Sequence, residues 1–114
     1  MKIKSLYICV KDMDRAISFY EDLFEVKVTK KDDLFSIFDL SGFHFCLFNY
    51  QKTKEAHQYG NSCLPSLEVE DLATLQTKLK KLKVVFPLTV IGNNYVAEFI
   101  DSEGNQVEIT APKV

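Results

Sequence analysis

The sequence has few of the residues that identify specialised classes of protein. Its three cysteines, Cys9, Cys46 and Cys63, are odd in number and widely spaced, which predicts reduced thiols and argues against a disulfide framework. No Cys-x-x-Cys pair is present, so the signature of a structural zinc site is missing. The N-terminus also lacks the apolar core of a signal peptide. Together these absences predict a cytoplasmic protein.

Strong charge and long apolar runs are missing as well. The net charge is −2, with no basic stripe or arginine-rich arm, and this argues against a nucleic-acid partner. No apolar run approaches the ~18 residues of a membrane span, so no membrane partner is expected. What is present, 46% hydrophobic and 26% charged residues in a chain of 114, is typical of one soluble domain with a real core.

One pattern organises the chain: an extended run stops at an Asp, and a helical period begins. The run from Ile3 to Val10 predicts a strand, and Asp12 follows it as a plausible N-cap. The predicted helix covers residues 12–24. Residues at i, i+3, i+4 and i+7 predict its buried face: Ala16, Phe19, Tyr20 and Leu23.

The same pattern returns in the second half. The run from Leu64 to Val69 predicts a strand, and Asp71 caps a helix predicted over residues 71–82. A polar stretch at 51–61 separates the copies and is interpreted as a linker. Module 1 then covers about residues 1–50, and module 2 about residues 62–114, of a single domain.

Three further strands are predicted in each copy. They cover residues 26–30, 34–40 and 43–50 in the first copy, and 84–88, 95–100 and 106–110 in the second. Turns are predicted at Ser41-Gly42 and at Asp101–Gly104. The fold class is therefore α+β, two tandem βαβββ modules forming a curved eight-stranded cup, with both helices outside and a cavity between the copies.

Two motifs carry a resemblance to a known family. Val10-Lys11-Asp12 is followed by Phe19-Tyr20 on the first helix, and the chain ends with Phe99-Ile100-Asp101-Ser102-Glu103-Gly104-Asn105-Gln106-Val107-Glu108. In this order the motifs resemble the glyoxalase, bleomycin-resistance and extradiol-dioxygenase superfamily, also called the vicinal oxygen chelate fold. Ser102 stands where that family usually has Pro, and a type I turn accepts either residue.

The resemblance also implies where a metal would bind. Metal-dependent members place two His and two carboxylate ligands at positions that correspond here to Ser5, Leu64, Cys46 and Glu108. Only Glu108 is the expected ligand type. A hard divalent cation needs several oxygen and nitrogen ligands, so no metal, cofactor or catalytic residue is predicted.

Strand alternation predicts which side chains line the cavity. The predicted ligand-binding residues are Glu108, Tyr7, Ser5, His44, Cys46, Phe48 and Glu68. Simpler interpretations stand beside this one. His44 is also explained as a hydrogen-bonded or exposed side chain, and Cys46 as a small apolar filler, because nothing adjacent in sequence lowers its pKa. Tyr7 and Phe48 are also explained as sheet packing.

Three functions remain open. The first is a metal-free protein that binds or sequesters a small, partly apolar ligand, as the resemblance to the bleomycin-resistance branch implies. The second is a lyase or dioxygenase with atypical ligands, namely His44, Cys46, Glu68 and Glu108. The third is a structural or regulatory dimer without a ligand. The nine Phe and five Tyr and the resemblance together predict a homodimer.

Overall fold

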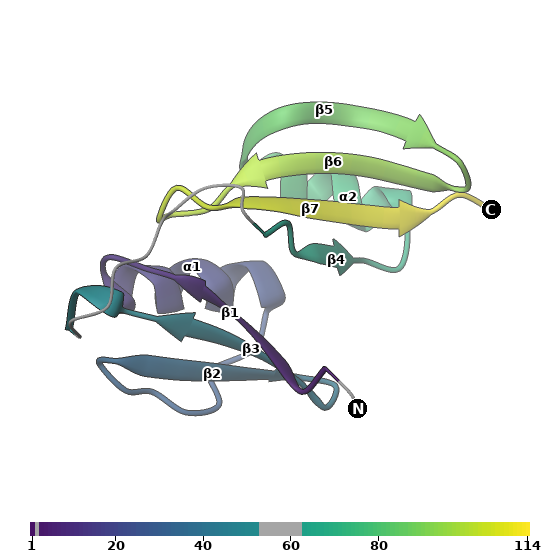
Figure 1. Cartoon of the computed structure of the whole chain (residues 1–114). Helices are drawn as coiled ribbons and strands as arrows, with labels where there is room; N and C mark the ends of the chain where they lie inside the picture. The colour runs from purple at the N-terminus through teal and green to yellow at the C-terminus, as the bar shows by residue number, and fades with distance from the viewer. Residues whose placement is uncertain (2, 53–62) are drawn as a thin grey trace. The chain divides into compact units, whose positions relative to one another are not determined.

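The computed structural model describes residues 1, 3–52 and 63–114 and divides the chain into two compact units, Met1–Tyr59 and Gly60–Val114 (Figure 1). The first contains β1 (Ser5–Cys9), α1 (Met13–Phe24), β2 (Phe35–Leu40), β3 (Phe43–Phe48) and the short 3₁₀ helix η1 (Tyr50–Lys52). The second contains β4 (Ser66–Glu68), α2 (Leu72–Leu79), β5 (Lys83–Ile91), β6 (Asn94–Ile100) and β7 (Gln106–Pro112). Most of the predicted linker at 51–61 lies outside the described residues.

The first unit is a three-stranded sheet with one helix on one face. The strand order is β1-β3-β2, in which β1 runs parallel and β2 antiparallel to β3 (Figure 1). Tyr20 of α1 connects the layers, because its ring centroid lies 5.0 Å from that of Phe45 and 6.5 Å from that of Phe38. All three side chains are buried, so this core is built largely from aromatic rings.

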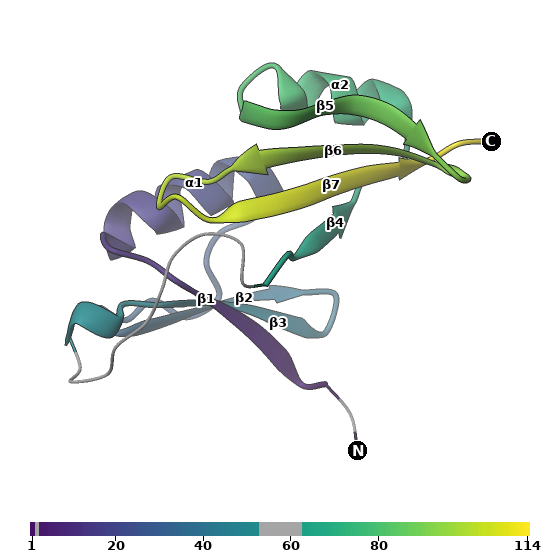
Figure 2. The same cartoon turned by 45° about the horizontal axis from the view of Figure 1, so that its top comes forward.

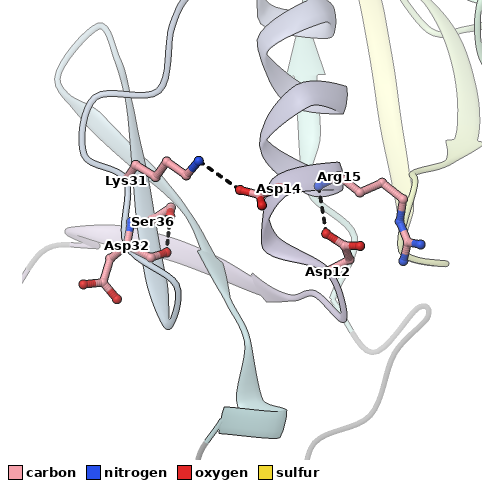
Figure 3. A network of polar contacts seen from close by, with 6 residues as sticks. All are labelled: Asp12, Asp14, Arg15, Lys31, Asp32 and Ser36. Carbon is pink, nitrogen blue, oxygen red and sulfur yellow. Dashed lines mark hydrogen bonds and ion pairs between the residues drawn. The ribbon is translucent and has the colours of Figure 1, made fainter.

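Helix α1 begins where the sequence predicts. Asp12 has an extended backbone, and its Oδ1 accepts a hydrogen bond of 3.0 Å from the Arg15 N–H (Figure 3), which satisfies a free donor of the first turn. Five side chains of the helix are buried: Met13, Ala16, Ile17, Tyr20 and Leu23. Phe19, predicted on this face, is only half-buried.

The strand predicted at residues 26–30 is wrong. This segment makes a single bridge between Lys30 and Ile37, in which the Ile37 N–H donates to the Lys30 carbonyl over 2.9 Å. Val26 is 44% exposed, and the Val28 N–H donates a hydrogen bond of 2.9 Å to Glu21 Oε2 of α1, so this donor is not used in a ladder with β2. The Lys31 ammonium lies 2.9 Å from Asp14 Oδ1 (Figure 3), and this hydrogen-bonded carboxylate raises the pKa of Lys31.

A two-residue turn joins β2 to β3. Ser41 and Gly42 both have positive φ, 54° and 90°, the backbone expected of a type I′ hairpin. Asp39 Oδ1 accepts a hydrogen bond of 2.8 Å from the Gly42 N–H. The turn was predicted at these residues, and its geometry fixes the register of the two strands.

The second unit is a four-stranded sheet in the order β4-β7-β6-β5 (Figures 1 and 2). As in the first unit, the first strand runs parallel to the last, here β4 beside β7. The helix α2 packs mainly against β7. The buried side chains of this unit are mostly aliphatic: Leu75, Val96, Ala97, Phe99, Val107, Ile109 and Ala111.

Helix α2 is shorter than its predicted span of 71–82. It begins as predicted, because Asp71 Oδ1 accepts a 2.8 Å hydrogen bond from the Thr74 N–H, and this bond lowers the pKa of Asp71. It ends at Leu79, after which the Lys81 and Leu82 N–H groups bond three residues back, to Lys78 and Leu79. Such bonds tighten a helix end into a 3₁₀ turn. No helix of the described residues is long and apolar enough to span a bilayer.

The β6–β7 turn is held by one buried carboxylate. Asp101 Oδ1 accepts hydrogen bonds of 2.8 Å from the N–H groups of Glu103 and Asn105. Gly104 has a φ of 89°, which its lack of a Cβ allows. The Ser102 hydroxyl lies inside this turn without a hydrogen-bond partner among the described residues.

The predicted α+β class and the repeated order of strand, helix and strands are confirmed. The described residues form seven strands in separate sheets of three and four, so an eight-stranded surface is not confirmed. The difference comes from residues 26–30. In the second unit the corresponding strand β5 is longer than predicted, because it continues through Pro87 to Ile91, which an edge strand tolerates.

Candidate functional site

Strand register places the predicted residues of the first unit on one face of its sheet. Ser5 pairs with His44, Tyr7 with Cys46, and Cys9 with Phe48 across the parallel β1–β3 ladder. The alternate residues, including Phe45, face α1. We call the face opposite α1 the helix-free face of the first sheet. The five residues predicted in this unit all lie on it.

Three aromatic rings meet on this helix-free face. The Tyr7 centroid lies 6.0 Å from that of Phe35 and 5.7 Å from that of Phe48, with the rings nearly perpendicular. Edge-to-face packing of this kind is favourable and leaves ring surface available. Tyr7 is 52% exposed. This aromatic trio therefore offers contact area to an apolar or aromatic group.

A polar row lies beside the aromatic trio. Ser5, His44 and Asp39 occupy one register position across the three strands. His44 Nε2 lies 3.6 Å from Asp39 Oδ2, while the other oxygen of Asp39 is held by the Gly42 N–H. The carboxylate is thus fixed in place and attracts His44 when the imidazole is protonated.

The two cysteines of this face are poor nucleophiles. Burial raises the pKa of the Cys46 thiol, and it raises the pKa of Cys9 in the same way. Cys46 is 1% exposed. A neutral buried thiol is neither a reactive nucleophile nor a ready thiolate ligand, so the interpretation of Cys46 as a small apolar filler fits the structure.

The helix-free face of the second sheet is acidic. Glu108 pairs directly with Glu98 across the antiparallel β6–β7 ladder and with Ser66 across the β4–β7 ladder. Ser66 Oγ donates a hydrogen bond of 2.6 Å to Glu108 Oε1. Gln106 Nε2 donates to Glu98 Oε1 in the same way. The two carboxylates are therefore neighbours, and a neutral donor orients each of them.

Glu98 was missed by the sequence reasoning, although a signal existed. If residues are counted outward in both directions from Asp101 and Asn105, which flank the turn, Glu98 falls opposite Glu108. This count works only when the length of the turn is known. Glu68, which was predicted, pairs with Thr110 and lies one row away from Ser66 on the same face. Glu68 is exposed.

The residues at the family's metal positions do not fit a hard divalent cation. Ser5 offers a neutral hydroxyl, Cys46 a buried thiol with a raised pKa, and Leu64 no donor atom. Glu108 is the remaining carboxylate, and Ser66 already donates to it. Within each unit, the described residues contain no group of three His, Cys, Asp or Glu side chains placed to hold a metal. No chemistry is therefore assigned to a metal here.

Solved structures with a similar fold identify the fold of this chain. The lactoylglutathione lyase from Agrobacterium tumefaciens is 21% identical with a TM-score of 0.78, over 98% of this chain and 94% of that one. A glyoxalase/bleomycin resistance protein/dioxygenase family enzyme from Burkholderia phytofirmans is 14% identical with a TM-score of 0.79, over 96% and 97%. At such identities the likeness shows the fold alone.

A third solved structure agrees, and the family itself follows from the sequence match. A glyoxalase/dioxygenase from Nostoc punctiforme is 14% identical with a TM-score of 0.72, over 97% of this chain and 90% of that one. No curated protein matches the chain. The sequence profile of one family matches residues 2–109, nearly the whole length. The chain therefore belongs to the Glyoxalase/Bleomycin resistance protein/Dioxygenase superfamily.

Proposed function

We propose that the protein binds a small, partly apolar organic molecule through the helix-free face of its second sheet and needs no metal to do so. The observation that carries the proposal is the carboxylate pair of Glu98 and Glu108, which lie directly opposite each other in register. Like charges in this position destabilise a sheet. A ligand cation between them relieves that repulsion.

The chemistry of this acidic face describes the polar part of the ligand. An amine or a guanidinium group satisfies two adjacent carboxylates, and charge-assisted hydrogen bonds of this kind are among the stronger ones. In the first unit, taken by itself, the aromatic trio of Tyr7, Phe35 and Phe48 offers a separate surface for an apolar or aromatic group. A molecule that carries an amine or guanidinium group is therefore the proposed ligand of the second sheet, with Glu108 as its principal polar contact.

Ser66 and Gln106 keep the carboxylates in place before the ligand arrives. Each donates one hydrogen bond to one oxygen of its partner, leaving the other carboxylate oxygens available as acceptors. Binding then costs little reordering of these two side chains. For the same reason, we expect a Ser66→Ala variant to bind more weakly while keeping the charge of the site.

A thermal-shift screen of cationic amphiphiles and of divalent metals tests the proposal. Glu108→Gln keeps the shape of the side chain and removes its charge. We expect it to weaken a cationic hit by about 1–3 kcal/mol, the scale of a charged hydrogen bond. The control is Glu70→Gln, an exposed carboxylate that precedes the α2 cap, and it should leave the shift unchanged.

Two outcomes of the screen would contradict the proposal. Ligand shifts that are equal in wild type and Glu108→Gln would remove Glu108 from the site. A large shift with a metal alone that disappears in Glu108→Gln would overturn the metal-free proposal and favour the lyase or dioxygenase alternative, with His44, Cys46, Glu68 and Glu108 as its ligands. Metal analysis of protein purified without chelator distinguishes the metal-free proposal from the lyase or dioxygenase alternative independently of the screen.

The proposed setting is a homodimer in the cytoplasm. The odd cysteine count supports a reducing compartment. Large apolar side chains remain exposed in both units, among them Tyr7, Phe43 and Phe86, and such surface in a small protein supports self-association.

A further inference from the structure

The carboxylates of Glu98 and Glu108 belong to a longer row of side chains on the helix-free face of the second sheet. Phe86 of β5 pairs with Glu98, and Ser66 of β4 pairs with Glu108, across the strand order that Figure 2 shows. Neighbouring strands lie about 4.8 Å apart. Glu98 therefore has an aromatic ring on one side and a second carboxylate on the other.

The backbone of β5 is irregular on both sides of Phe86. The ladder to β6 shifts register between Val84 and Phe86, and again between Phe86 and Thr89. Pro87, which has no N–H for a ladder, lies within the second shift. Such irregularities change the direction of single side chains and are frequent beside functional sites.

The ring of Phe86 is available to a ligand. Phe86 is 36% exposed, because β5 is the edge strand of the sheet and α2 packs mainly against β7. Its pairing with Glu98 places it on the face opposite the helix. Phe86 thus offers an apolar, aromatic contact next to the proposed cation site.

The hydrogen bonds within the row restrict what a ligand must supply. Ser66 Oγ donates to Glu108 Oε1 over 2.6 Å, and Gln106 Nε2 donates to Glu98 Oε1. The second oxygen of each carboxylate remains an acceptor. A ligand that uses the whole row must therefore donate N–H groups to two separate carboxylates and also pack against the ring of Phe86.

Three kinds of organic cation meet these requirements to different extents. A guanidinium donates from several edges of one plane, and its face stacks on an aromatic ring. A quaternary ammonium packs well on a ring but has no N–H for the carboxylates. A primary ammonium has three donors but is compact and strongly hydrated, so contact with Phe86 costs it more desolvation.

We infer that the ligand of this row is a guanidinium compound and that Phe86 is the residue that gives it preference over amines. The inference rests on the proposed function, because it requires that the two carboxylates bind a cation. Glu108 then contributes to the binding of any cation, whereas Phe86 determines which cation binds best. Glu98 lies between them and contacts the guanidinium together with the ring.

One cation of the chain itself lies close to this row. Lys83 pairs with Ile100, which is two residues from Glu98 and on the same face. In the part of the chain that the structure describes, Lys83 forms no ion pair with Glu98 or Glu108. When its ammonium approaches these carboxylates, it competes equally with every ligand cation. Lys83→Met should therefore strengthen all of them and leave the preference among them unchanged.

Nuclear magnetic resonance titration of the isotope-labelled full chain tests the inference. The probes share one alkyl chain and differ in the cation: butylguanidinium, butylammonium and butyltrimethylammonium. Each should shift the amide signals of Glu98 and Glu108. We expect butylguanidinium to bind about 5- to 10-fold more tightly than butylammonium, because it adds bidentate donation and stacking.

Phe86→Leu keeps an apolar side chain and removes the ring. It should weaken butylguanidinium about 3- to 10-fold and leave butylammonium nearly unchanged, whereas Phe86→Tyr should keep the preference. The matched control is Phe43→Leu, at a phenylalanine of similar exposure in the first unit (38%), and it should keep the preference as well. Amide spectra of the free variants verify that each is folded.

The inference and the proposed function can fail separately. A preference that is the same in wild type and Phe86→Leu, or that disappears in Lys83→Met, would remove the role of Phe86. Tighter binding of either ammonium probe in wild type would overturn the guanidinium class. In these cases a loss of binding in Glu108→Gln would leave the proposed function standing. If none of the three cations binds, both proposals are wrong.

Discussion

The two units have the same chain order but very different interiors. In the first, Tyr20 packs against Phe24, Phe38 and Phe45 at ring distances of 5.2, 6.5 and 5.0 Å. In the second, the corresponding space is filled mainly by Ala, Val and Ile side chains. Signals at element ends, an Asp before each helix and a Gly in each hairpin, therefore specify the topology, while the chemistry of the interior varies freely.

The helices differ in the same way. Five side chains of α1 are buried, whereas α2 has one, Leu75. Since most helical stability in a protein comes from packing of the apolar face, α1 is held by many contacts and α2 by few. The helix-free faces diverge as well, one being aromatic and the other acidic.

The largest expected effect tests the aromatic interior. Phe38 is fully buried between Tyr20 and Phe24, so Phe38→Ala should lower the free energy of unfolding by about 3–5 kcal/mol. Urea denaturation measures this. Phe43→Ala, at a residue 38% exposed, is the control, and a loss as large as that of Phe38→Ala would contradict the assigned interior.

The next effect tests the single anchor of α2. Leu75 is 0% exposed, and Leu75→Ala should cost about 2–5 kcal/mol. Hydrogen exchange sharpens the comparison, because amides of α2 should exchange faster than those of α1 in the wild type. Equal protection of both helices would show that the number of buried side chains does not set their local stability.

A smaller effect, in the opposite direction, is expected in the turn of the second unit. Ser102 has a buried hydroxyl without a partner among the described residues. Ser102→Pro removes this hydroxyl and restricts the unfolded chain, which should raise the free energy of unfolding by about 0.4–1 kcal/mol. Ser102→Ala separates the two causes, because it removes the hydroxyl alone. A lower melting temperature in both variants would contradict this account.

The smallest effect concerns the cap of α2. The Thr74 N–H lowers the pKa of Asp71 below 3.8, so the cap stabilises the folded state above that pH. Its contribution is lost as the pH falls through the lowered value. Asp71→Asn keeps an acceptor at the cap without titrating, so its melting temperature should fall less than that of wild type between pH 5 and 2.5. Parallel curves would show that Asp71 contributes nothing.

Sequence reasoning located the features that depend on neighbouring residues. Asp12 and Asp71 were identified as caps because a carboxylate before an apolar helical period has a direct physical role. Ser41-Gly42 was identified as a turn for a similar reason. The shared faces of Ser5, Tyr7 and Cys9 follow from alternation alone.

What the sequence did not show depends on pairing across the chain. The residues at 26–30 have a strand-like composition but form only one β-bridge with β2, between Lys30 and Ile37. That Glu98 and Glu108 are neighbours becomes evident only once the register of β6 and β7 is known. The exposure of the β5 side chains depends on where α2 ends and on which strand α2 packs against. No local sequence pattern predicts the end of α2 or its packing partner.

The pairing of first and last strands has a consequence for how the chain is made. In the second unit Ser66 lies beside Glu108, so β4 cannot pair until β7 (Gln106–Pro112) has been synthesised. In the first unit β1 can pair as soon as β3, whose last residue is Phe48, has been synthesised. On the ribosome the first unit can therefore close while the second is still being translated. The second can close only after β7 has left the exit tunnel.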